Sequence, residues 1–398
     1  MKKIKNNTLL FSILLLVVSN YSFANTCEFK AVSFLTDFEG GKLSSCEQLT
    51  ENHFLLTTDA EDWPINRSPW YAFKVKLKKP GKPQKLKLTV AAVDARSRYI
   101  PKISDDGDKW RETSFTVQDA KLNFDIEVSD QVYVAAQEII DNADYQTWIE
   151  KISASSSFGQ VSIGESSQGR KIDGLIYQQP NNKEWILIIG RQHPPEVTGA
   201  MALLSFVEEI AGQVSNNANF ASRFNILVIP NLNPDGVAEG NWRHNVNGID
   251  LNRDWGKFTQ KETQIVQQKL EQLLTEDQRL VFALDFHSTQ QDIFYTMPTD
   301  YHIAPQELVN NWLAKVKEHS LSSFVVRPKP GTSPGRGVFK QYIADTYHVQ
   351  AVTFEIGDNT QRDLIEHVGV VSAHTLVDIL LKTPSQAFIY TAPNAETK

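Results

Sequence analysis

Short apolar runs alternate with helix-like segments from about residue 155 onward. The run at 185–190 precedes a helical pattern at 197–213, and the run at 224–230 precedes another at 259–274. Two more apolar runs and two more helical patterns follow, at 280–286 and 351–356 and at 305–319 and 361–381. Such alternation is typical of a mixed, mostly parallel sheet with helices on both faces. Ligands of these sheets gather beyond the carboxyl ends of the strands, so we expect a site there.

Residues 25–150 have a different, β-rich pattern. Apolar and polar residues alternate over 70–77 and 85–93, and Pro80-Gly81 marks a turn between the two segments. We therefore predict a small antiparallel β-sandwich domain at 25–150. The α/β domain at 151–390 would carry the functional site.

The first 24 residues have the organisation of a secretory signal peptide. Three lysines precede an apolar stretch at 9–18, and Ser22 and Ala24 place small side chains at a cleavage site. The stretch is about half as long as a membrane-spanning helix, which makes an uncleaved membrane anchor the less favoured alternative. We expect a secreted or periplasmic protein.

The net charge of the chain excludes some classes of binding partner. The formal net charge is −7, and loss of residues 1–24, which hold three lysines and no acid, would bring it to −10. An acidic chain is a poor candidate for binding nucleic acid or, after signal cleavage, an anionic membrane.

The only two cysteines, Cys27 and Cys46, predict a disulfide in an exported protein. Two buried free thiols are the alternative.

Candidate metal ligands follow two of the apolar runs. His193 and Glu196, in the sequence His-Pro-Pro-Glu, come after the run 185–190, and His287 ends the run 280–286. Catalytic zinc sites use three protein ligands, and two His with one Glu is an established set. Taken alone, each of these two sequence features also has an ordinary structural explanation. A Glu in a first helical turn favours the helix dipole, and a lone His after a strand is often structural.

Two other features suggest substrate chemistry. The polar segment 233–253 contains Arg243 and Arg253, and guanidinium groups bind carboxylates through two hydrogen bonds. A solvated loop is the alternative. Glu355 lies inside the apolar run 351–356. Burial of a carboxylate is unfavourable unless it has a partner or a function.

Together these residues resemble the zinc metallocarboxypeptidase family, in order and in type, over about 155–385. The resemblance implies a carboxypeptidase-like fold and one Zn²⁺ ion. The metal ligands would be His193, Glu196 and His287, with Asp250 orienting His193. The general base would be Glu355, and Arg243 would polarise the scissile carbonyl. The terminal carboxylate of the substrate would be bound by Asn252 and Arg253.

A narrower resemblance is to the cytosolic carboxypeptidase branch, which removes glutamates from acidic tails. It is carried by residues 70–73 and 99–104 and by the segment 331–336, whose Arg336 would favour an acidic residue at the substrate's C-terminus. A surface arginine is the alternative. The sequence departs from the family because 302–341 contain no tyrosine where a mobile one is expected, and Tyr342 follows. The signal sequence departs from a branch with cytosolic members.

The resemblance predicts a zinc-dependent exopeptidase acting on peptides with a free C-terminal carboxylate. A periplasmic carboxypeptidase or amidase of cell-wall (murein) peptides is the alternative on the same site. An acylase of the aspartoacylase kind shares the zinc ligands, but the polar segment 233–253 favours a peptidase. A non-catalytic binding protein would usually lack a ligand or the base, and all four are present.

Overall fold

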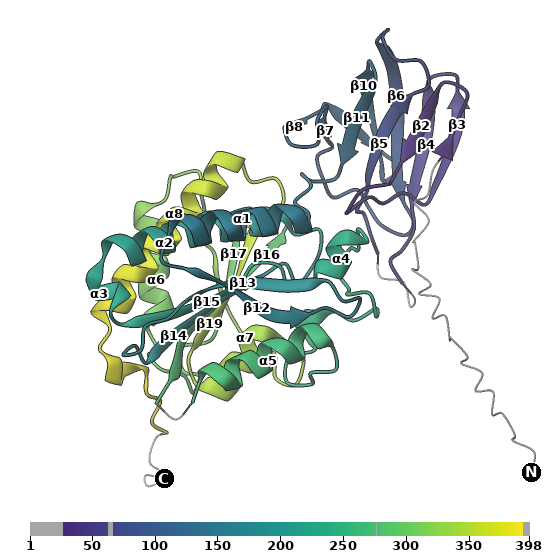
Figure 1. Cartoon of the computed structure of the whole chain (residues 1–398). Coiled ribbons are helices and arrows are strands. Elements are labelled where there is room, and N and C mark those ends of the chain that lie inside the picture. The colour runs from purple at the N-terminus through teal and green to yellow at the C-terminus, as the bar shows by residue number, and fades with distance from the viewer. Residues whose placement is uncertain (1–26, 63–66, 276, 393–398) are drawn as a thin grey trace, which may run out of the picture.

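The computed structural model describes residues 27–62, 67–275 and 277–392. The predicted signal peptide at 1–24 lies outside the described residues. Figure 1 shows a β-sandwich, coloured purple to blue, beside a larger α/β part that follows it in the chain. Helix α1 (Asn142–Ser155) comes after the last sandwich strand and packs on the α/β part.

Two sheets form the sandwich, in the strand orders β1-β2-β5-β11-β7-β8 and β3-β4-β6-β10-β9. The strands of the first are β1 (Cys27–Glu28), β2 (Val32–Leu35), β5 (Ala72–Leu77), β11 (Gln131–Ala135), β7 (Lys102–Ser104) and β8 (Trp110–Glu112). Those of the second are β3 (Ser45–Thr50), β4 (His53–Thr58), β6 (Gln84–Ala92), β10 (Lys121–Val128) and β9 (Phe115–Gln118). Alternate side chains of both sheets fill one core.

One strand pair differs from the predicted antiparallel arrangement. Strands β4 and β6 pair in parallel, whereas the other named sandwich pairs are antiparallel. The chain leaves one sheet after β4, forms β5 in the opposite sheet and returns for β6, so it re-enters in the same direction. The Pro80-Gly81 turn therefore connects the two sheets and does not close a hairpin.

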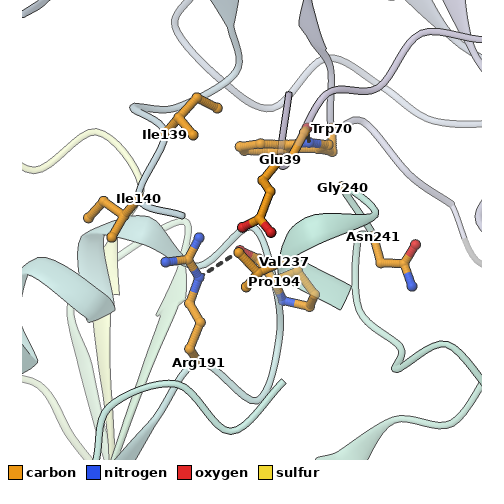
Figure 2. A pocket seen from close by; sticks show the side chains of 10 residues that line it. Glu39, Trp70, Ile139, Ile140, Arg191, Pro194, Val237, Gly240 and Asn241 are labelled. Carbon is orange, nitrogen blue, oxygen red and sulfur yellow. Dashed lines mark hydrogen bonds between the residues drawn. The ribbon is translucent and has the colours of Figure 1, made fainter. Parts of the chain in front are cut away.

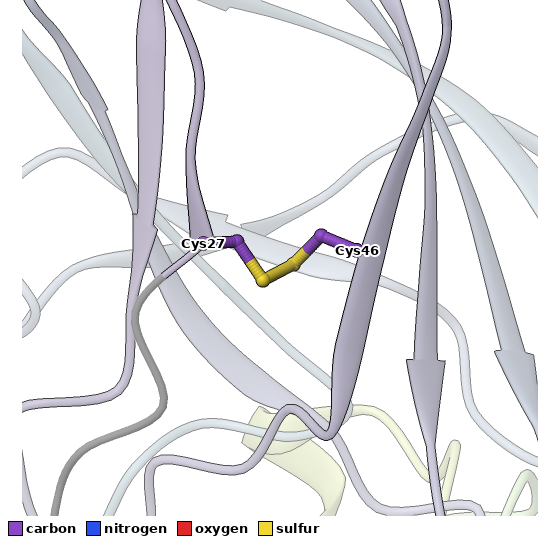
Figure 3. The surroundings of a disulfide bond; sticks show 2 residues. All are labelled: Cys27 and Cys46. Carbon is purple, nitrogen blue, oxygen red and sulfur yellow. A yellow bond between two sulfur atoms is a disulfide. The ribbon is translucent and has the colours of Figure 1, made fainter.

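The predicted disulfide is confirmed. Cys27 in β1 and Cys46 in β3 are bonded, with their Cα atoms 6.0 Å apart, and thereby join the two sheets (Figure 3). A cross-link that closes a loop of this length stabilises a fold by about 3 kcal/mol, chiefly by restricting the unfolded chain.

An eight-stranded sheet organises the α/β part, in the order β12-β13-β15-β14-β16-β19-β17-β18. Its strands are β12 (Gly159–Glu165), β13 (Lys171–Tyr177), β14 (Glu184–Gly190), β15 (Phe224–Ile229), β16 (Arg279–Thr289), β17 (Ile293–Thr296), β18 (Pro328–Pro330) and β19 (Gln350–Gly357). The four central strands, β15, β14, β16 and β19, are parallel. Their carboxyl ends therefore meet at one edge.

Helices cover both faces of this sheet, as predicted (Figure 1). One face packs against α1, α2 (Val197–Asn216), α6 (Leu308–His319) and α8 (Arg362–Lys382), and the other against α5 (Lys261–Leu273) and α7 (Phe339–Tyr347). The shorter helices are α3 (Ala218–Ala221) and α4 (Pro234–Ala238). By length and composition α2 and α8 would suffice to cross a membrane, but more than half of the apolar 18-residue window of each helix is buried inside the protein.

The sandwich and the α/β part meet through polar contacts and a small cavity. Glu39 of the sandwich accepts hydrogen bonds from the backbone and side-chain nitrogens of Asn142, at 3.1 and 2.9 Å. Figure 2 shows Glu39 and Trp70 facing Arg191 and Pro194 across a cavity of about 10 Å³. The interface thus lies beside the segment that contains His193.

Candidate active site

Three candidate metal ligands converge at the carboxyl edge of the central sheet. Nδ1 of His193 lies 2.8 Å from one carboxylate oxygen of Glu196, and Nδ1 of His287 lies 2.7 Å from the other. The two Nδ1 atoms are 3.2 Å apart. One donor atom from each residue thus lies within 4.8 Å of the others.

The local structure aims these side chains at one point. Glu196 is the N-cap residue of α2, yet within the described chain its side chain makes no capping hydrogen bond, which leaves the carboxylate to face the histidines. Gly199, in the first turn of α2, brings the helix against β16. A Cβ at this position would lie 2.2 Å from the carbonyl oxygen of His287.

Each histidine is oriented from behind by a carboxylate. Nε2 of His193 lies 2.9 Å from Oδ1 of Asp250, and Nε2 of His287 lies 2.7 Å from Oδ2 of Asp285. With the Nε2–H donated to these acids, both Nδ1 lone pairs point at the convergence point. This arrangement fixes the tautomer of a metal-bound imidazole.

The residues fit a zinc ion. Two imidazole nitrogens and a carboxylate oxygen that face one another at these distances call for a cation between them, and this donor set is one that catalytic zinc uses. Burial alone would raise the pKa of Glu196, but the two histidines beside it hold that pKa well below its usual range.

Glu355 lies beside this group because of strand register. It is the direct neighbour of His287 on the adjacent parallel strand, so the two side chains share a face. Among the described residues its Oε2 has no hydrogen-bond partner, and that atom is closed to solvent. Burial, together with the negative charge of Glu196, raises the pKa of Glu355 to about 7.

Arg243 and Asn252 lie beside the candidate metal ligands, in the segment that follows α4. Nε of Arg243 donates to Oδ2 of Asp250 at 2.7 Å, and its side chain remains 35% exposed. The Asn252 amide nitrogen lies 3.4 Å from Nε2 of His287, while its oxygen accepts a hydrogen bond from the Phe339 backbone at 2.9 Å. Asp250 thus contacts both Arg243 and His193 and holds the two side chains together.

Three guanidinium groups lie near one another beside the candidate metal site. Burial lowers the pKa of Arg253, and the nearby charges of Arg243 and Arg336 lower it further. The loop that carries Arg336 packs on Arg253, since a Cβ on Gly337 would lie 2.2 Å from the Arg253 carbonyl oxygen. Arg336 itself is exposed. The cluster is suited to anionic groups of a ligand.

Several residues near the site were not assigned from the sequence. Gln192 donates to Asp285 at 2.7 Å, and Asp285 in turn orients His287. The role of Asp285 could have been predicted, because residues two apart on a strand point to the same face, and Asp285 lies two residues before His287 in an apolar run. Tyr342, the nearest tyrosine in sequence, lies on α7, is partly buried and stacks on Trp255 of the adjacent core.

One other group of three potential metal ligands occurs among the described residues: Glu61, Asp62 and His244. Hydrogen bonds account for it. The Glu61 carboxylate accepts from the backbone nitrogens of Arg243 and His244, at 3.0 and 2.8 Å, and Asp62 contacts the His244 ring. A sandwich loop therefore holds the Arg243 segment from outside.

The fold and the donor set together define a metallopeptidase-like α/β protein. The chain belongs to the zinc carboxypeptidase family, since the sequence profile of that family, Peptidase_M14, matches residues 145–367.

The fold is shared with solved bacterial enzymes. A metallo-carboxypeptidase from Burkholderia cenocepacia is 18% identical with a TM-score of 0.73, over 88% of this chain and 98% of that one. A metallo-carboxypeptidase from Pseudomonas aeruginosa, in complex with (2-guanidinoethylmercapto)succinic acid, is 20% identical with a TM-score of 0.71, over 87% and 98%.

The curated relatives found by sequence match smaller parts of the two chains than these solved structures do. An uncharacterised protein of Zymomonas mobilis is 25% identical over 232 residues, 56% of this chain and 59% of that protein. Cytosolic carboxypeptidase 2 of Danio rerio is 22% identical over 319 residues, 70% of this chain and 44% of that protein. Cytosolic carboxypeptidase 6 of Mus musculus is 33% identical over 104 residues, 25% of this chain and 19% of that protein. The chain spans less than two thirds of the length of each relative.

Proposed function

We propose that this protein is a zinc-dependent exopeptidase that hydrolyses the C-terminal peptide bond of peptides. The observation that carries the proposal is the register between His287 and Glu355, which sets a carboxylate with a raised pKa directly beside the candidate metal ligands. A base with a pKa near neutrality is suited to proton transfer at physiological pH.

One Zn²⁺ ion, held by His193, Glu196 and His287, would supply a Lewis acid for the scissile carbonyl and would acidify water. Glu355 would accept the proton of the attacking water and pass it to the leaving amine. Arg243, held by Asp250, would stabilise the negative charge that develops on the carbonyl oxygen. The protein thus contributes the base and the charge stabilisation.

Substrate selection would depend on the arginine cluster. Asn252 and Arg253 would bind the terminal carboxylate, which restricts cleavage to the last residue of a chain. Arg336, exposed on the adjacent loop, would favour an acidic side chain at that residue.

A release assay on peptides that differ only in their last residue tests the proposal. We expect zinc-dependent release of Glu or Asp to exceed release of Leu, and Arg336→Glu to reverse that order. Loss of all release on chelation, with recovery on zinc addition, identifies the metal. Wild-type protein that binds zinc and cleaves none of these peptides would contradict the peptidase assignment.

We also propose that the protein is exported, because of the signal-like residues 1–24 and the disulfide. A murein tripeptide is then a second candidate substrate, since its diaminopimelate and γ-glutamyl units carry the carboxylates that the arginines would bind. A comparison of kcat/KM for the tripeptide and a Glu-ending peptide decides between the two. Mass spectrometry of the native N-terminus tests cleavage after Ala24.

A further inference from the structure

We propose that Arg98, a residue of the sandwich, is a positioning residue for the active site of the α/β part. Its guanidinium contacts three segments that each carry a proposed functional side chain. The inference rests on the proposed function. It gives the sandwich a definite role, because removal of this one side chain would loosen the base, a metal ligand and the oxyanion-stabilising arginine together.

The first contact is with the segment that follows Glu355. Arg98 binds Asp358 through two parallel hydrogen bonds, 2.6 Å from Nε to Oδ2 and 3.0 Å from Nη2 to Oδ1. The Asp358 side chain is only 2% exposed, so its charge depends on this partner. Asp358 lies three residues beyond the proposed base. The arginine therefore fixes the chain immediately after β19.

The second contact is with the segment that carries His287. Nη2 of Arg98 also donates to the backbone carbonyl oxygen of Ser288, at 3.3 Å. The backbone nitrogen of Asp358 in turn donates to the carbonyl oxygen of Thr289, at 2.8 Å. Arg98 thus bridges the ends of β16 and β19, the two strands whose register aligns His287 with Glu355.

The third contact is with Trp242, the residue before Arg243. The guanidinium lies 5.0 Å from the centroid of the Trp242 ring, a distance at which the cation and the aromatic face attract each other. Tyr99 packs edge-on against the same ring, with 6.0 Å between centroids. Trp242 thus contacts two consecutive residues of the sandwich.

Only arginine can make this set of contacts from one side chain. A lysine ammonium is a point charge and cannot combine a two-bond carboxylate pair, a carbonyl hydrogen bond and a flat face against an indole. The contacts reach the segments of Glu355, His287 and Arg243, and they do not include Asn252 or Arg253. The expected defect is therefore in turnover and zinc retention and not in binding of the terminal carboxylate.

The test uses the full chain with Arg98→Met, Arg98→Lys and the matched control Arg96→Met. Arg96 is exposed in the same loop two residues earlier. We expect Arg98→Met to lower kcat about 10–100-fold with KM within about threefold, because residues that orient metal ligands have effects of this size. Arg98→Lys should recover little of the loss, and Arg96→Met should match wild type.

Zinc affinity gives a readout that does not depend on turnover. We expect Arg98→Met to weaken zinc binding about 10-fold in a chelator competition, even if wild type cleaves none of the peptides offered. The proposal is overturned if a folded Arg98→Met variant keeps wild-type kcat and zinc affinity, or if only its KM changes. If the Met variant does not fold, the Lys variant decides: wild-type kcat and zinc affinity in Arg98→Lys overturn the proposal equally.

Discussion

Glu355 is a half-buried carboxylate within a mostly apolar strand, and a substitution that changes a single group of its side chain tests its chemistry. Glu355→Gln preserves shape but removes the proton acceptor. We expect kcat to fall at least about 10²-fold, since general-base catalysis contributes 10² to 10⁴. Zinc content should stay at one equivalent by metal analysis, because the ligand atoms belong to other residues. Turnover above about a tenth of wild type would exclude Glu355 as the base.

The same residue should give the metal-free protein a pH-dependent stability. Its pKa is raised from 4.5 to about 7 in the folded state, so the folded chain retains the proton that the unfolded chain loses. Stability contributed by this proton is complete below pH 4.5 and is lost as pH rises to 7.

Glu355→Gln has no such proton to lose. In chelator-treated protein we therefore expect the free energy of unfolding of wild type, relative to the variant, to fall by up to about 3 kcal/mol between pH 4.5 and 7 and to level off above that. Urea melts at pH 5, 6, 7 and 8 measure the difference. A difference that does not change with pH would mean that Glu355 titrates near its ordinary value.

A functional residue can be predicted from the sequence when its side chain is unusual for its surroundings. Glu355 could be singled out because a carboxylate in an apolar run needs an explanation. Arg98 could not, because an arginine in a polar loop is ordinary. Its partners Ser288 and Asp358 lie 190 and 260 residues away, and only the folded chain brings them together.

At the scale of elements, helix α2 must lie close to strand β16 for Glu196 and His287 to bind one metal ion, as proposed. Gly199→Ala would place a methyl group 2.2 Å from the His287 carbonyl oxygen. Because that obstacle is backbone, the helix or the strand end must shift. We expect a lower Tm, a loss of roughly 2 kcal/mol, and weaker zinc binding.

Gly212→Ala in the same helix is the matched control. Apart from its chain neighbours and the backbone of its own helix, no heavy atom of the described residues lies within 4 Å of a Cβ at this position, and alanine is the better helix former. We expect that variant to keep its zinc affinity and to gain up to about 1 kcal/mol. Equal effects of the two substitutions in thermal melts would show that helix propensity, and not helix–strand approach, governs both.

Periodicity predicts most of the elements but not their pairing. The apolar runs become β14, β15, β16 and β19, since strands that are buried on both faces have nearly continuous apolar sequences. The parallel β4–β6 pair could not be predicted, because crossing between sandwich sheets depends on connections that local patterns do not specify.

At the scale of the whole molecule, the polar links between its two parts lie around the active site. Glu61 holds the Arg243 segment, Arg98 holds the ends of β16 and β19, and Arg362 binds Glu138 of the segment after β11 at 2.7 Å. The buried Arg98–Asp358 pair should add little net stability, because the desolvation of the two charges offsets their attraction. We therefore expect the docked sandwich to order the Arg243 segment and the ends of β16 and β19.

Zinc and the disulfide should therefore stabilise different parts of one cooperative molecule. Zinc adds RT ln(1 + [Zn]/Kd), about 4 kcal/mol at a thousandfold excess over Kd, through the α/β part. The Cys27→Ser/Cys46→Ser variant loses about 3 kcal/mol from the sandwich alone.

If the interface couples the two parts, each change shifts a single thermal transition, seen equally by tryptophan fluorescence and far-ultraviolet circular dichroism. The two shifts should then add, because Cys27–Cys46 joins the sandwich sheets and touches none of the proposed metal ligands. Two separate transitions, of which only one moves with zinc, would mean that the parts unfold independently and that the contacts of Arg98 and Glu61 are too weak to transmit order to the site.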